Sequence, residues 1–156
     1  MSVHIGLTVA QRTGAAKILN GILADEYVLY TKTRNFHWNV TGPHFSELHK
    51  FFESQYEELD EAIDDIAERV RALDQTPLST LKGFLENTRL KEASTDLSAA
   101  KMIEALLSDH EAIVRQLRAD LETIKEEHGD TGNQDFLTGL MEQHEKMAWM
   151  LRALSA

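Results

Sequence analysis

The stretch FSELHKFFESQYEELDEAIDDIAERVRAL, residues 45–73, decides the fold class. Its apolar side chains recur every three or four residues, the period that gathers them on one face of an α-helix. They are Phe45, Leu48, Phe52, Tyr56, Leu59, Ile63, Ile66, Val70 and Leu73. Neither glycine nor proline interrupts the pattern before Pro77, so we predict one long amphipathic helix.

Three further segments have the same period. The first covers residues 8–40 and ends at Gly42 and Pro43; the others cover about 95–128, ended by Gly129, and 134–154. Residues 77–93 form a connection with a short helix near 79–86, and its length indicates a crossover rather than a tight turn. We therefore predict an all-α, ferritin-like four-helix bundle. It forms a single domain over residues 1–156, with a short N-terminal tail at 1–7.

The amino-acid composition excludes some classes of function and disfavours others. The chain has 156 residues, no cysteine and a net charge of −10. Absence of cysteine excludes disulfides, iron–sulfur clusters and thiolate metal sites. The acidic balance disfavours nucleic-acid binding, which depends on clustered lysine and arginine. The sequence has no membrane span and no secretion signal that we can recognise, so a cytoplasmic protein is expected.

Two histidines flank the Gly-Pro break between the first two predicted helices. Reflecting this hairpin about residue 43 places His37 opposite His49, and Glu53 follows one helical turn after His49. Two imidazoles and a carboxylate suit Fe, Zn or Mn, and three protein ligands leave such a site open.

A second pair of candidate ligands lies farther along the same helix. Asp64 and Glu68 are four residues apart and therefore share a face. Fifteen residues separate His49 from Asp64, about 22 Å along a helix at ~1.5 Å per residue. One metal ion cannot contact both pairs within one chain. Either the pairs are unrelated, or they meet across a two-fold axis between two chains.

Each residue also has a purely structural interpretation. Glu57, Asp60, Asp64 and Glu68 could form a solvated acidic face, and His37 could be a packed histidine at a helix end. The paired histidines and the displaced acid pair, taken together, favour the metal-site interpretation.

The motif HWNVxGxxFxxxH over residues 37–49, followed by Asp64 and Glu68, resembles the Dps proteins (DNA-binding proteins from starved cells, or mini-ferritins). The resemblance extends to PLSTLKGFLENT and DFLTGLMEQHEKMAWMLRAL, and so to essentially the whole chain. It implies a hollow dodecamer with ferroxidase centres between two-fold-related subunits. Residues matching His37 and His49 come from one chain, and those matching Asp64 and Glu68 from the other.

The resemblance also implies an activity. Fe(II) would be oxidised, preferentially by hydrogen peroxide and otherwise by oxygen, and ferric mineral would be stored in the cavity. Several family members have aspartate at the position of Glu53, so direct ligation, a water-mediated contact and a second metal position stay open there. Trp38 is a candidate electron donor or, equally, an interface-packing aromatic.

Three acids surround the turn before the last predicted helix. The resemblance implies that acids here line the pores through which iron enters the cage, although an ordinary exposed turn explains them almost as well. They are Glu126, Asp130 and Asp135. Asp135 could also be a charge that favours a helix N-terminus.

Two other functions compete with the ferroxidase. One is a DNA-compacting nucleoid protein with a vestigial metal site, and the other is a divalent-metal binder, for example of Zn, without redox chemistry. Residue types alone do not separate Fe from Zn. Residues 1–24 contain only Arg12 and Lys17 as Arg or Lys, so weak or absent DNA binding is expected.

Overall fold

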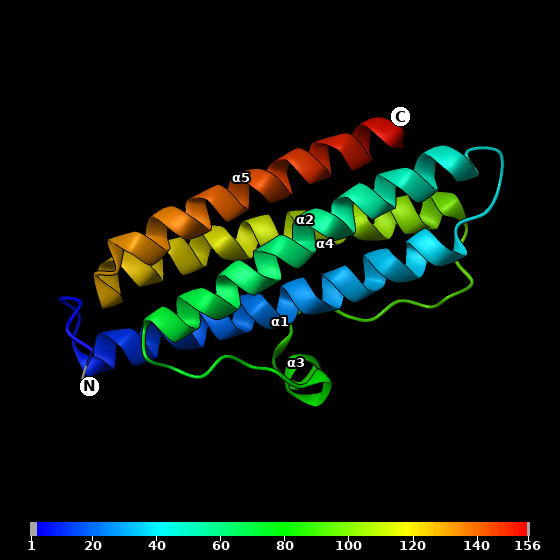
Figure 1. Ribbon diagram of the computed structural model, residues 1–156. Coiled ribbons are helices and arrows are strands. Elements are labelled where there is room, and N and C mark those ends of the chain that lie inside the picture. The colour runs from blue at the N-terminus through cyan, green and yellow to red at the C-terminus, as the bar shows by residue number, and fades with distance from the viewer. Residues whose placement is uncertain (1–2, 156) are drawn as a thin grey trace.

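Four long helices lie side by side in the computed structural model, which describes residues 3–155 (Figure 1). They are α1 (Val9–Asn39), α2 (Phe45–Ala72), α4 (Ala99–Thr123) and α5 (Thr131–Leu154). A short helix, α3 (Leu81–Asn87), lies outside the bundle, and a π-helical turn, η1 (Ile124–His128), extends α4. The predicted four-helix bundle with an additional short helix is confirmed.

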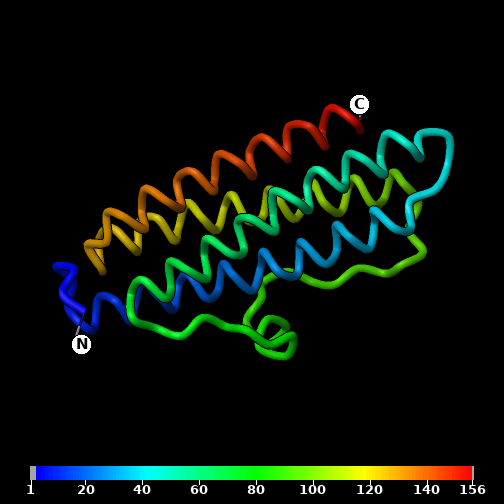
Figure 2. The backbone as a smooth tube through the Cα atoms, viewed as in Figure 1, coloured from blue at the N-terminus to red at the C-terminus, as the bar shows by residue number. Residues whose placement is uncertain are grey.

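The long connection between α2 and α4 determines the topology. It runs from one end of the bundle to the other along α1, and it contains α3 (Figure 2). As a consequence, α1 and α2 form one antiparallel hairpin, α4 and α5 form a second, and α2 runs parallel to α4. This is the crossover that the length of the connection predicted.

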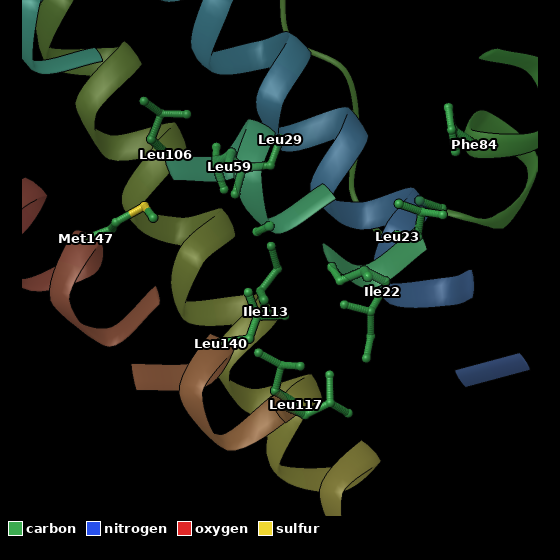
Figure 3. Packing of buried hydrophobic residues seen from close by; sticks show 14 of the residues in the cluster. Ile22, Leu23, Leu29, Leu59, Phe84, Leu106, Ile113, Leu117, Leu140 and Met147 are labelled. Carbon is green, nitrogen blue, oxygen red and sulfur yellow. The ribbon is translucent and has the colours of Figure 1, made fainter. Parts of the chain in front are cut away.

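The apolar stripes of the four helices meet in one continuous core. Leu59, Leu106 and Leu140 come from three different helices and are all buried in it (Figure 3). In the stripe of α2, Leu48, Phe52 and Leu59 are buried as predicted, whereas Phe45 is 44% exposed because it lies at the first position of the helix.

Side-chain caps set the helix starts, and two predicted starts were wrong. Ser98 caps α4 and Asp130 caps α5, each accepting a hydrogen bond from a backbone N–H three residues later. The helices therefore begin near residues 99 and 131, rather than 95 and 134. The other predicted boundaries are close: Thr8 caps α1, and Gly129 ends η1 with a φ of 60°, a conformation that favours glycine.

The connection is attached to the bundle through a buried carboxylate. Asp25 of α1 accepts hydrogen bonds from the Thr88 hydroxyl at 3.0 Å and from the Arg89 backbone N–H and Nε, both at 2.6 Å. Arg89 also contacts Asp120 of α4 at 3.1 Å. These bonds fix the crossover against both hairpins. No helix within residues 3–155 is apolar over the length that a membrane crossing requires.

Candidate metal centre

The structure places the two histidines of the first hairpin face to face. His37 lies in the last turn of α1 and His49 in the second turn of α2, and their ring centres are 3.8 Å apart with 20° between the planes. The predicted pairing across the Gly-Pro turn is confirmed. His37 is buried and His49 is half-buried.

Reciprocal hydrogen bonds fix the tautomer of both rings. Nδ1 of His37 lies 2.7 Å from the carbonyl oxygen of His49, and Nδ1 of His49 lies 2.8 Å from the carbonyl oxygen of His37. Because a carbonyl oxygen only accepts, each Nδ1 carries a proton and donates it. The lone pair of each neutral ring is then on Nε2, the nitrogen left to bind a metal ion. Metal-binding histidines usually donate their second ring nitrogen in this way.

Aromatic side chains pack around the guanidinium group of Arg34, next to the histidine pair. The guanidinium lies 4.7 Å from the ring centre of Tyr56 and 5.1 Å from that of Trp38. Tyr56 meets the His37 ring edge-on at 5.2 Å, and its hydroxyl lies 3.4 Å from Glu53. Burial, and then the Glu53 carboxylate, raise the pKa of Tyr56, so its hydroxyl stays protonated and can donate. Trp38 itself is 64% exposed.

The acid pair lies far from the histidines of its own chain. Asp64 and Glu68 are exposed on the uninterrupted helix α2, which also contains His49. No group of three His, Asp or Glu side chains within residues 3–155 converges closely enough to hold a metal ion. The chain therefore brings together His37 and His49, but it adds neither Glu53 nor the acid pair to them as a third ligand.

The three acids predicted near a pore differ in their surroundings. Asp130 is buried, and its carboxylate accepts from the backbone N–H of Asn133 at 3.0 Å and from the Asn133 amide group. Its role within the chain is to cap α5. Glu126, which lies 3.4 Å from Lys125, and Asp135 are both exposed.

The bundle also contains a buried chain of three hydrogen-bonded polar side chains, which the sequence pattern did not predict. Nε2 of His144 lies 2.8 Å from Glu26, and Nδ1 of His144 lies 2.8 Å from Nδ1 of His110. All three side chains are fully buried. A signal was present, because Asp25 and Glu26 interrupt the most apolar part of α1, between Leu23 and Val28. The acid that pairs with His144 is 118 residues away in sequence, so local spacing did not show it.

Comparisons with known proteins agree with this architecture. The chain matches the family described as Ferritin-like domain over residues 16–156. An uncharacterized low temperature-induced protein of Nostoc sp. is 49% identical over 152 residues, 97% of this chain and 85% of that protein. DNA protection during starvation protein 2 of Bacillus anthracis is 42% identical over 137 residues, 88% of this chain and 93% of that protein.

A solved structure resembles the whole bundle. It is the crystal structure of the Dps protein from Vibrio cholerae O1, described as a member of a broad superfamily of ferritin-like diiron-carboxylate proteins. The TM-score is 0.93 at 32% identity, covering 100% of this chain and 98% of that one. Fold and sequence thus define a ferritin-like protein. Within that class, the chain belongs to the Dps family, as the histidine motif indicated.

Proposed function

We propose that this protein is a ferroxidase and iron store whose oxidation sites form between two chains. His37 and His49 of one subunit would face Asp64 and Glu68 of a second subunit related by a two-fold axis. The observation that carries the proposal is the stacked histidine pair, whose two Nε2 atoms have no hydrogen-bond partner within residues 3–155. An isologous interface would make two equal sites per dimer.

Asp64 and Glu68 would supply the carboxylate ligands that the histidine pair of one chain lacks. Carboxylates at four-residue spacing on an exposed helix face can both reach a metal ion brought by another chain. Nitrogen and oxygen ligands together suit iron, and the added negative charge favours Fe(III) over Fe(II). Glu53, half-buried next to Tyr56, would ligate directly, hold a water molecule or bind a second iron.

Iron is the substrate of the proposed reaction, and hydrogen peroxide the preferred oxidant. Two Fe(II) ions each give one electron to one peroxide molecule, its O–O bond breaks, and two protons complete two water molecules. Oxygen would serve as the alternative oxidant. Trp38, which is exposed with its ring centre 5.1 Å from the Arg34 guanidinium, would donate an electron to a stray radical near the site.

Storage of ferric mineral requires a closed protein cage. We propose that the subunits form the hollow dodecamer of their family and that ferric mineral collects inside. Of the acids near the α4–α5 turn, Glu126 and Asp135 are the better candidates for a pore because both are exposed, whereas Asp130 caps α5. Exposed carboxylates repeated around a symmetry axis would concentrate Fe(II).

Anaerobic loading with Fe(II), followed by peroxide, tests the proposed activity. We expect ferric absorbance to rise rapidly in the wild type, and at least tenfold more slowly in a His37→Ala/His49→Ala variant that has lost both nitrogen ligands. His44→Ala is the matched control, because it removes an exposed histidine from the same hairpin. A wild-type rate equal to that of free Fe(II) would overturn the proposal. Zn uptake without oxidation would favour the non-redox metal binder.

DNA binding separates the ferroxidase from the nucleoid protein. We expect no retardation of duplex DNA in a gel at physiological salt, because the chain has a net charge of −10. Retardation that weakens steeply as salt is added would reveal a basic surface and would favour the DNA-compacting alternative.

A further inference from the structure

The buried polar chain of Glu26, His144 and His110 connects the two hairpins of the bundle. Glu26 belongs to α1, His144 to α5 and His110 to α4, and each is fully buried. The bond between Glu26 and His144 therefore crosses from one hairpin to the other at mid-bundle. It lies apart from the histidine pair at the hairpin turn, and the proposed iron chemistry does not use it.

The number of protons in this chain follows from its geometry. Each of the two contacts, at 2.8 Å, needs one proton between its heavy atoms. Two neutral imidazoles supply two ring N–H groups: His144 donates from Nε2 to Glu26, and His110 donates from Nδ1 to His144. The chain is then complete, and Nε2 of His110 keeps a lone pair with no partner within residues 3–155.

If either imidazole gains a third proton for the pair, the hydrogen bonding changes at the same atom, Nε2 of His110. The contact between the Nδ1 atoms of His110 and His144 has room for only one proton. A charged His144 would donate its Nδ1 proton to Nδ1 of His110, and His110 would then carry its own proton on Nε2. Direct protonation of His110 has the same result. In both cases a buried N–H points where no acceptor lies, which is costly in an apolar interior.

The neighbouring elements offer the extra charge little compensation. The buried residues of α2 include no titratable group, and Gln55 is their only polar member. On α1, the buried cation Lys32 is paired at 2.5 Å with Asp109, the residue before His110. On α5, His144 is the only buried titratable residue. Glu26 itself bonds to His144 through Oε1, and within residues 3–155 its Oε2 has no partner and no hydrogen bond joins it to His110.

We propose that the Glu26–His144–His110 chain is an acid-sensitive lock, which joins the hairpins while both rings are neutral and opens when one ring gains a proton. Burial, and then the neighbouring His144, lower the pKa of His110 well below 6.5, in agreement with this assignment. Below about pH 6.5, the His110 ring of the unfolded protein binds a proton that the folded protein excludes from this ring. Stability from the lock is therefore complete above that pH and declines as the pH falls.

The test compares unfolding by denaturant between pH 8 and pH 5 in the full protein. For the wild type, we expect the exclusion of one proton from His110 to contribute about a tenfold increase in the unfolding equilibrium constant for each pH unit below about 6.5. His110→Gln removes the titratable ring but keeps an amide N–H to donate to His144, so this contribution should disappear. His44→Gln removes an exposed histidine and should retain it.

A second measurement on the wild type does not depend on the variant folding. Solid-state NMR of ¹⁵N-histidine-labelled protein at pH 5.5 should retain the signals of a neutral ring, with one Nδ1–H and one bare Nε2, at His110. Equal pH dependence in the wild type and in His110→Gln would overturn the proposal. So would a folded protein at pH 5.5 in which every histidine ring is charged.

Discussion

Mixing two inactive variants should restore ferroxidase activity, because each would supply the half-site that the other lacks. One variant carries His37→Ala and His49→Ala, and the other carries Asp64→Ala and Glu68→Ala. Alone, neither should oxidise Fe(II) faster than the uncatalysed reaction. When equal amounts are unfolded together and refolded, half of the two-fold dimers should be mixed, and each mixed dimer has one intact site. Activity should therefore return to about a quarter of the wild-type value.

This result depends on ligands from two chains. If each site used ligands from one chain only, no mixture could contain an intact site, and the activity would stay absent. Wild-type protein taken through the same cycle controls for losses during refolding. Native mass spectrometry confirms that both variants occupy one assembly. An inactive mixture that passes both controls would contradict the shared site without excluding iron binding elsewhere.

Replacing Asp25 by alanine should cause a large loss of stability. The carboxylate is almost fully buried and accepts from Thr88 and from three nitrogens of Arg89, the shortest contact being 2.5 Å to Nη2. Removing it leaves these donors without that acceptor and breaks this attachment of the crossover to α1, although Asn20 and Asn35 of α1 keep their hydrogen bonds to the crossover. We expect a loss of about 3 kcal/mol in the free energy of unfolding, or about 6–12 °C in the midpoint of thermal unfolding.

The measurement needs a fixed protein concentration, since assembly also stabilises the fold. Glu86→Ala is the matched control: it removes an acid from the same connection, but one that is exposed and forms a surface ion pair with Lys82 at 3.6 Å. Such surface ion pairs contribute little to the free energy of unfolding, so the control should unfold at the same temperature as the wild type. If Asp25→Ala unfolded with the wild type as well, the crossover would be held by its other contacts and not by the carboxylate. Those contacts include Phe84 stacked on Tyr27 at 4.2 Å and the hydrogen bonds of Asn20 and Asn35.

The helices and the histidine pair could be predicted because both depend on local periodicity. The three- and four-residue spacing in residues 45–73 requires one amphipathic helix, and a tight turn at Gly42 and Pro43 brings His37 to His49 in any antiparallel hairpin. The predicted first residues of the helices were less accurate than the predicted helices themselves. Serines, threonines and acids occur near several possible starts, and only the folded backbone shows that Ser98 and Asp130 are the caps.

The sequence by itself determined the four helices, the crossover, the hairpin and the family to which the motif belongs. Only the tertiary structure showed that Glu26 meets His144, that Asp25 holds Arg89, and that each of His37 and His49 donates Nδ1 to the other's carbonyl oxygen. The physical reason is the range of the interactions. Helical periodicity repeats within a few residues, whereas a buried polar group finds its partner wherever packing of distant helices places one.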